Sequence, residues 1–458
     1  MQKFDLIVIG SGSGLDVAKT IAQHGPKVAI VERSKMGGTC LNTGCIPSKL
    51  LLHSADVAET IKRAHLFGIN TNGFSVDFRR IVERVNTIID NDSEKIKNAL
   101  EGLDNPKLFS SECKFIGIKT ISCGGNKEEL TAEKILIAAG SRPKIPDIEG
   151  LNNTSYLTSD DALRLTKQPK ILTIIGGGYI ACELAHFFGS LGTEIHILQH
   201  KDRLIPSEDQ DVSKKITELY SKKYNLLLDC TAQSVSRKGS MYNIKTRNVS
   251  GDVVEIVSDQ LLIAAGRTPN SDTLDLEKTG VLTNDKGYIT TDDFLETNVR
   301  GIFALGDVIG RYPFKHSANL EAQYAYHNIL NHDEKIPVDY TAMPHAIFCS
   351  PQVAGVGYTE QELTYRMKVE YKKSYHRYIH TAMGKAILDE AGFVKFMINA
   401  KSKEILGCHI LGTEASTLIH EVIPIMRNGN GTIGKVVNSI HVHPALSEVI
   451  AKAAFVLM

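Results

Sequence analysis

The 458-residue chain is 42% hydrophobic and 23% charged, which is typical of an ordinary globular protein, and its length suits about three domains. Lys+Arg and Asp+Glu each number 52, so a net charge of zero gives no indication of a nucleic-acid or anionic-membrane partner. No apolar run reaches the roughly 18 residues of a membrane-spanning helix, and the N-terminus lacks the apolar region of a signal peptide. We expect a cytoplasmic protein with no nucleic-acid or membrane partner.

A strand, a glycine turn, a helix and a second strand are predicted in that order over residues 4–32. Gly10 permits a tight turn, and Gly12 lets backbone amides approach a pyrophosphate at the helix N-terminus. Glu32 ends the second strand, where a carboxylate can bind ribose hydroxyls. The third glycine of the usual pattern is replaced by Leu15, and we expect Gly14 to relieve the crowding. The pattern predicts a dinucleotide site, the alternative being a glycine turn without a ligand.

Two of the eight cysteines, Cys40 and Cys45, lie in one short glycine-containing segment, and the other six are scattered along the chain. A structural disulfide framework is not expected in such a chain. A position near a helix N-terminus would lower the thiolate pKa and favour disulfide exchange. The spacing does not match zinc or iron–sulfur sites, so no metal is expected. Two buried structural cysteines remain the alternative interpretation.

The strand–turn–helix–strand pattern recurs at residues 171–198, with Gly176, Gly178 and Ala181 in the turn. The position equivalent to Glu32 holds Gln199, followed by His200 and further basic residues. The absence of a carboxylate favours NADP over NAD, although a solvated charge cluster is the alternative and use of both coenzymes stays open.

Two similar segments close the two units. Residues 136–140 lead into Ser141, and residues 262–266 lead into Arg267. Each predicts a buried strand ending at a turn of small residues, where backbone can approach a ligand. From about residue 340, strands at 392–398 and 405–411 and helices at 417–426 and 448–456 predict a third, α+β domain.

Several motifs together resemble the pyridine nucleotide–disulfide oxidoreductase family over the whole chain. The segment 40–49 is similar to the redox motif of the family, 301–307 to its second FAD motif, and 443–448 to its C-terminal histidine–glutamate dyad. The resemblance implies an α/β fold with two Rossmann-like nucleotide-binding domains, for FAD and NAD(P), and a C-terminal α+β dimerisation domain. The expected boundaries are 1–147 and 271–337 for FAD binding, 148–270 for NAD(P) binding and 338–458 for dimerisation.

The resemblance also implies the chemistry. NADPH or NADH would reduce the FAD, which would reduce a Cys40–Cys45 disulfide, with Cys45 facing the flavin and Cys40 exchanging with substrate. His443, oriented by Glu448, would reach in from the partner subunit of a homodimer as the general acid–base.

Further site residues follow from the same resemblance. Lys49, paired with Glu183, would lie beside the flavin; Tyr179 would cover the nicotinamide pocket and Asp307 would bind the ribityl chain. The residues expected to bind the two cofactors are Gly10, Gly12, Gly14, Glu32, Gly38, Thr39, Lys49, Ala139, Gly140, Ser141, Gly306, Asp307, His316, Gly176, Gly178, Tyr179, Ala181, Gln199, His200, Gly266 and Arg267.

The choice within the family rests on smaller features. The C-terminus has no cysteines, which argues against mercuric reductase and the large thioredoxin reductases, and the intact redox pair argues against soluble transhydrogenases. Residues 183–186 and 315–322 are more similar to mycothione reductases, whereas 45–49 and 446–448 also match dihydrolipoyl dehydrogenases. We favour a reductase of a low-molecular-weight disulfide. A dihydrolipoyl dehydrogenase acting with NAD on a lipoyl-domain substrate, and a non-catalytic flavoprotein subunit, are the alternatives.

Overall fold

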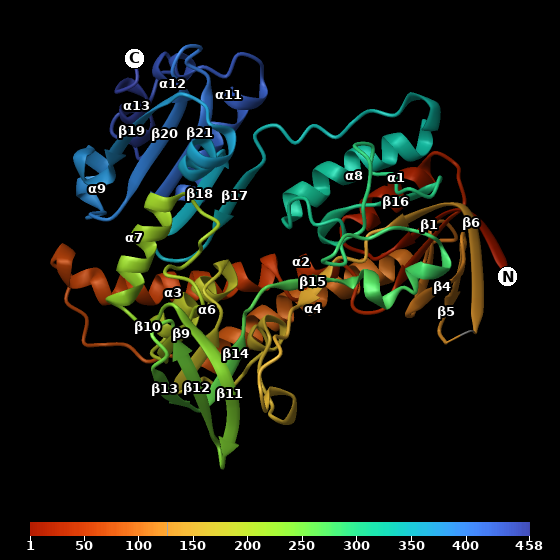
Figure 1. Ribbon diagram of the computed structural model, residues 1–458, viewed down its shortest axis with the longest axis horizontal. Coiled ribbons are helices and arrows are strands. Elements are labelled where there is room, and N and C mark those ends of the chain that lie inside the picture. The colour runs from red at the N-terminus through yellow and green to blue at the C-terminus, as the bar shows by residue number, and fades with distance from the viewer. Residues whose placement is uncertain (126) are drawn as a thin grey trace.

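The computed structural model describes residues 1–125 and 127–458, which form a mixed α/β fold of three units (Figure 1). The described residues form five sheets, of seven, four, three, two and five strands. The first sheet has the strand order β3-β2-β1-β6-β5-β4, and β16 also pairs with β6. Its strands are β1 (Gln2–Ile9), β2 (Val28–Glu32), β3 (Lys107–Ser110), β4 (Cys113–Gly117), β5 (Thr120–Cys123), β6 (Glu128–Ile137) and β16 (Ile302–Ala304). The strands β3, β2, β1, β6 and β16 are parallel, as expected for a buried nucleotide-binding sheet.

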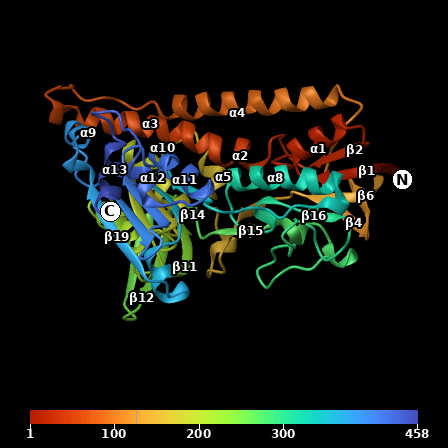
Figure 2. The same ribbon diagram turned by 90° about the horizontal axis from the view of Figure 1, so that it is seen from above.

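The helices of this unit are α1 (Gly14–Gln23), α2 (Gly38–Asn42), α3 (Cys45–Arg63), α4 (Phe78–Glu101) and α8 (Lys315–Leu330). Helix α1 joins β1 to β2, so the first predicted strand–turn–helix–strand unit is confirmed. Figure 2 shows α3 and α4 extended along one side of the molecule. Leu51 and Leu52 of α3 belong to the same buried cluster as Phe187 and Phe188, so α3 fastens the first unit to the second.

The second unit contains the parallel sheet β10-β9-β8-β14 and the antiparallel sheet β11-β12-β13. Its strands are β8 (Ile171–Ile175), β9 (Glu194–Leu198), β10 (Asn225–Leu227), β11 (Cys230–Lys238), β12 (Met241–Asn248), β13 (Val253–Ser258) and β14 (Gln260–Ile263). Its helices are α5 (Ser159–Ala162), α6 (Tyr179–Ser190) and α7 (Gln210–Ser221). Strands β8 and β9 have the predicted bounds, and α6 joins them, so the internal repeat is confirmed.

The chain crosses between these two units at one short pair of antiparallel strands. Strand β7 (Ser141–Pro143) pairs antiparallel with β15 (Arg267–Pro269), and Lys144 N–H donates to Gly266 O at 2.9 Å. The chain therefore leaves and re-enters the first unit at one place.

The third unit contains one antiparallel sheet, called the third sheet below, in the order β17-β18-β21-β20-β19. It comprises β17 (Pro344–Ile347), β18 (Gln352–Gly357), β19 (Tyr371–Arg377), β20 (Phe393–Asn399) and β21 (Ile405–Gly412), with α9 (Ala382–Ala386), α10 (Ala415–Leu418), α11 (Ile423–Arg427), α12 (Ile433–Val437) and α13 (Glu448–Phe455). The single helix expected over 417–426 is wrong. It is broken into α10, a 3-10 turn and α11, because Pro424 has no N–H to continue the helical hydrogen bonds and instead lies in the first turn of α11. Within the described part of the chain, no helix has both the length and the apolar character needed to cross a membrane.

Candidate active site

Glycines bring three backbone segments together at the first turn. Gly10 has φ +103°, and a Cβ there would lie 2.3 Å from Ala138 O. A Cβ on Gly38 would lie 2.8 Å from the Gly12 Cα, so these two glycines press against each other without side chains. A Cβ on Gly14 would lie 2.8–2.9 Å from Ala138 Cβ and a Val8 methyl, which confirms that Gly14 permits the close packing that Leu15 cannot. The result is a hollow lined by backbone atoms, here called the cradle, at the N-terminus of α1.

The Glu32 carboxylate holds this turn in place. It is buried and accepts hydrogen bonds from the N–H of Ser11 at 2.8 Å and from its hydroxyl at 2.7 Å, while its second oxygen accepts from Ser34. The Ser11 hydroxyl in turn accepts from the N–H of Gly37, so the first turn is tied to the segment that carries the redox cysteines.

A cavity of about 1680 Å³ runs from this cradle to the cysteines, well above the roughly 300–1,000 Å³ of an ordinary ligand pocket. Most of the expected FAD-binding residues line it, namely Gly10, Gly12, Glu32, Gly38, Thr39, Lys49, Ala139, Gly140, Ser141, Gly306, Asp307 and His316. Gly14, also expected to bind FAD, does not line the cavity. The exposed backbone, the helix N-terminus and a carboxylate at the end of the second strand all suit a long dinucleotide, so these residues fit FAD.

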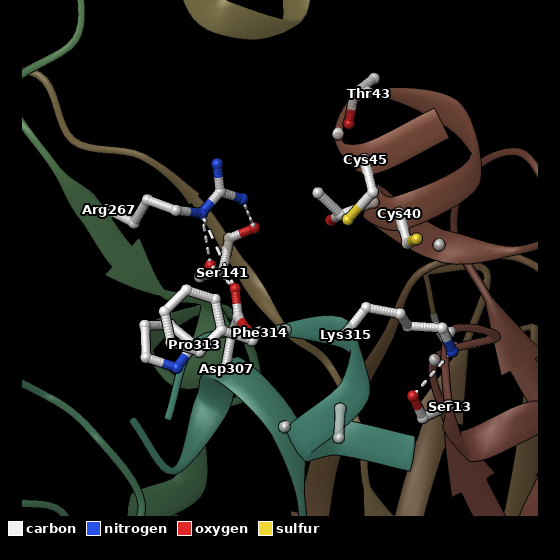
Figure 3. A pocket seen from close by; sticks show the side chains of 18 of the residues that line it. Ser13, Cys40, Thr43, Cys45, Ser141, Arg267, Asp307, Pro313, Phe314 and Lys315 are labelled. Atoms are coloured by element: carbon white, nitrogen blue, oxygen red, sulfur yellow. Dashed lines mark hydrogen bonds and ion pairs between the residues drawn. The ribbon is translucent and has the colours of Figure 1, made fainter. Parts of the chain in front are cut away.

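Cys40 lies in α2 and Cys45 is the first residue of α3, and both are free thiols whose side chains lie near each other at the cavity wall (Figure 3). The hydrogen bond from Cys40 lowers the pKa of Cys45 to about 7, and the Lys49 ammonium contributes in the same direction. The same bond raises the pKa of Cys40, which keeps the proton. The amide groups at the start of α3 also favour a thiolate. Cys45 is therefore the thiolate of the pair at neutral pH.

Lys49 and Glu183 form an ion pair at the cavity wall. The Lys49 Nζ lies 2.9 Å and 3.0 Å from the two Glu183 oxygens and 4.6 Å from the centre of the Phe348 ring. The N–H of Phe348 also donates to Glu183 at 2.9 Å. This arrangement fixes a positive charge one helical turn after Cys45.

Ser141, Asp307 and Arg267 form a hydrogen-bonded group opposite the cysteines (Figure 3). The Ser141 hydroxyl donates to Asp307 at 2.6 Å, while Arg267 Nε donates to that hydroxyl at 2.7 Å. His316 lies nearby, bonded through Nε2 to Pro344 O at 2.7 Å and stacked on Phe314. Ser141 precedes the other three residues by 126 positions or more, yet all four line one cavity.

Lys315 is a cavity residue whose role sequence reasoning missed. Its ammonium donates to the Ser13 hydroxyl at 2.8 Å and lowers the pKa of Cys40, although the bond to Cys45 outweighs that effect. A cation at the first position of α8 is unfavourable because the helix N-terminus is itself positive. That conflict between residue and position was the available signal.

The second glycine turn lies outside this cavity. Gly176 has φ +120°, and a Cβ there would lie 2.2 Å from Ala264 O, the same relation as between Gly10 and Ala138. The expected residues Gly176, Gly178, Ala181, Gln199, His200 and Gly266 surround this turn, whereas Tyr179 and Arg267 face the cavity.

The basic cluster beyond β9 is smaller than the sequence suggests. The Gln199 side chain is buried and bonded within its own loop, to His200 N–H and Arg203 O. Arg203 forms a two-point ion pair with Asp202. His200 and Lys201 are therefore the exposed basic residues there that could meet a coenzyme phosphate.

The structure does not bring the C-terminal dyad to the cysteines of the same chain. His443 Nδ1 lies 2.9 Å from a Glu448 oxygen, and this hydrogen bond lowers the pKa of Glu448. The His443 side chain is 74% exposed and is not part of the cavity wall. His443 and Glu448 are therefore paired, but the rest of the His443 ring is exposed to solvent in a single chain.

Comparison with known proteins places these features in context. Residues 4–322 match the family model of the pyridine nucleotide-disulphide oxidoreductases, and residues 343–454 match the dimerisation domain of that family. The dihydrolipoyl dehydrogenase of Chlamydia muridarum is 34% identical over 99% of this chain and 96% of that protein. The mycothione reductase of Mycobacterium tuberculosis is 33% identical over 99% of both chains. The HOCl-induced flavoprotein disulfide reductase RclA of Escherichia coli has a similar structure, with a TM-score of 0.88 and 26% identity over 99% of this chain and 100% of that one.

Proposed function

This chain belongs to the pyridine nucleotide-disulphide oxidoreductase family, and from that premise we propose that it reduces a low-molecular-weight disulfide with NADPH or NADH through Cys40 and Cys45. The observation that carries the proposal is the pair of neighbouring free thiols, with a Cys45 pKa of about 7, at the wall of a cavity whose residues fit a dinucleotide. FAD, when bound, supplies the two-electron transfer between the pyridine nucleotide and the cysteine pair.

The protein side of the reaction is a thiol–disulfide exchange. Cys40 attacks one sulfur of the substrate disulfide, a mixed disulfide forms, and the first substrate thiol leaves. Cys45 then attacks the Cys40 sulfur, which releases the second thiol and closes the Cys40–Cys45 disulfide. Two thiols form for each dithiol consumed, and the leaving thiolates need protons. His443 of the partner subunit, oriented by Glu448, is the proposed general acid–base: it takes the proton from Cys40 as that thiol attacks and gives it to the first leaving thiolate. Cys45 attacks as a thiolate, and the second leaving thiolate takes its proton from solvent.

A homodimer is part of this proposal. The match to the dimerisation domain supports it, and so does a group of exposed apolar side chains at the C-terminal end of the chain, namely Ile440, Val442, Phe455, Val456 and Met458. The proposed domain boundaries are 1–147 with 271–337, 148–270 and 338–458. The crossings at β7 and β15 and the return to the first sheet at β16 support them. A cytoplasmic location also remains a prediction.

The second candidate is a dihydrolipoyl dehydrogenase that oxidises a protein-bound dihydrolipoyl group with NAD. The 34% identity to the chlamydial enzyme over nearly the full length favours it. Gln199 in the place of the ribose-binding carboxylate favours NADPH and hence the small-disulfide reductase. A non-catalytic flavoprotein subunit is disfavoured because the thiol pair and the dyad are both intact.

Steady-state kinetics separates the candidates. Rates with small disulfides and NADPH are compared with rates for dihydrolipoamide and NAD, and the small-disulfide reaction is expected to be faster. Rapid turnover of dihydrolipoamide alone would overturn the proposal in favour of the second candidate. For the non-catalytic alternative, the readout is a long-wavelength absorption band on adding NADPH or NADH, present in wild type and absent in Cys45→Ser. No band with either coenzyme would exclude the proposed chemistry.

A further inference from the structure

Two histidines of the third sheet converge over one glycine. Gly355, on the middle strand β18, pairs in register with His345 on β17 and with His409 on β21. Residues opposite each other in neighbouring strands point to the same face of a sheet. The absence of a side chain at Gly355 leaves space between the rings: a Cβ there would lie 2.8 Å from both His345 Nε2 and His409 Nδ1.

A carboxylate from the second nucleotide-binding unit covers this pair. Glu208 precedes α7, which lies against the third sheet (Figure 1), and its oxygen is 2.8 Å from His345 Nε2. One ligand atom from each of Glu208, His345 and His409 can be chosen so that all lie within 4.8 Å of one another. Glu208 and His409 are buried, and His345 also lines the large cavity, which gives an ion a route to the group.

His409 is held in the form that binds metals. Its Nε2 donates to Tyr358 O at 3.0 Å, which leaves the lone pair on Nδ1. Among the described residues, Nδ1 is one of the buried side-chain atoms with no hydrogen-bond partner, and its ring is fully buried. Metal-binding histidines commonly donate their other ring N–H to a backbone carbonyl in this way. A buried acceptor without a donor is costly unless something else satisfies it.

The charges around the histidines also favour a cation. Four carboxylates meet this side of the sheet, from Glu208, Asp209, Asp211 and Glu360, and they face the ammonium groups of Lys373 and Lys395. Asp209 also lies close to the His409 ring. Negative charge therefore exceeds positive charge beside the two rings.

We propose that Glu208, His345 and His409 bind a Zn²⁺-class divalent cation that links the second nucleotide-binding unit to the third sheet. Two imidazoles and one carboxylate are a ligand set that zinc uses, with water in the fourth position. Bonds of about 2.1 Å keep tetrahedral ligands about 3.4 Å apart, so ligand atoms at the 4.8 Å limit would have to approach by up to about 1.4 Å, and the less buried His345 has the most room to move. In the metal-bound form the His345 proton lies on Nδ1, which leaves the Nε2 lone pair for the cation.

The test is metal binding by the oxidised, FAD-loaded protein, in which the closed Cys40–Cys45 disulfide offers no thiolate to metals. The C40S/C45S protein serves as a second background. Zn²⁺ is titrated against a chromogenic chelator, and Co²⁺ is used as an optical probe of four-coordinate geometry. Wild type is expected to bind one equivalent that E208Q and H345Q bind on the order of 100-fold more weakly or lose. Zn²⁺ should raise the unfolding midpoint of wild type but not of E208Q.

His196→Gln is the matched control. His196 Nε2 lies 3.0 Å from a Glu194 oxygen, so it forms the same kind of histidine–carboxylate pair without a second histidine. H196Q should bind Zn²⁺ like wild type. The proposal is overturned if wild type, E208Q and H345Q bind equally, if none binds, or if H196Q loses the same equivalent. E208Q and H345Q are preferred to a His409 variant because His409 is fully buried and its loss could impair folding.

Discussion

Replacing Cys40 tests whether its hydrogen bond is the main cause of the Cys45 thiolate. That bond is the largest effect that moves the Cys45 pKa from its ordinary 9.0 to about 7. Cys40→Ala removes the donor, so the pKa should rise towards 9, whereas Cys40→Ser keeps an O–H donor and should stay near 7. At pH 7.5 the thiolate fraction would fall from about three-quarters to about 3%.

The assay compares two holoenzymes that keep Cys45 as their only thiol of the pair. The long-wavelength absorption of each is recorded from pH 5.5 to about 10, and the rate of Cys45 alkylation by iodoacetamide is followed by peptide mass spectrometry. The midpoint in C40A is expected above that in C40S by up to about two pH units. Equal midpoints near 7 would refute the reasoning and assign the effect to Lys49 and the start of α3. Midpoints near 9 in both would show that no thiolate is favoured.

Three further predictions concern the rest of the site. Lys49→Met leaves the buried Glu183 carboxylate without its ion-pair partner and should destabilise the protein by about 1–3 kcal/mol; K49M/E183Q should recover part of this in thermal unfolding, and no recovery would contradict the pairing. Gly10→Ala should lower the free energy of unfolding by at least about 1–3 kcal/mol and weaken FAD binding. Gly25→Ala, at a glycine with φ +108° but open space around it, should lower the free energy of unfolding by less. Equal losses of stability in the two variants would show that contact with Ala138 is unimportant. Glu448→Gln and His443→Gln should slow disulfide exchange on the order of 10²–10⁴-fold with FAD retained. When equal amounts of H443Q and C40S chains re-form dimers at random, about half of the dimers are mixed and each has one intact site, so the mixture should regain about a quarter of wild-type activity; no regain would argue against a shared site.

Local pattern predicted the nucleotide-binding units well because each signal lies within one strand–turn–helix segment. The bounds of β8 and β9 and the role of Gly14 follow from hydrophobic periodicity and steric space at single positions. The broken helix at Pro424 was missed because a proline is tolerated at a helix start as well as at a break, and the apolar pattern continued past it.

Features that join distant segments could not be predicted in this way. The histidine pair over Gly355 depends on the register of three strands, and Glu208 reaches it from another unit. The cysteine spacing predicted no metal, and Glu208, His345 and His409 lie too far apart in the sequence to form a recognisable ligand pattern. The weakening of the basic cluster after β9 depends on Arg203 turning to Asp202, a choice between side-chain partners that residue types alone do not specify.

The β7–β15 ladder has a consequence for how this protein can be rebuilt. The segment between Pro143 and Arg267 begins and ends at hydrogen-bonded neighbours, with Lys144 joined to Gly266. A segment whose two ends are adjacent can be exchanged for a related one as a module, provided that the incoming segment keeps the apolar contacts that Phe187 and Phe188 make with α3. Coenzyme preference in such an enzyme can therefore change by replacement of the whole module as well as by substitutions around a single turn.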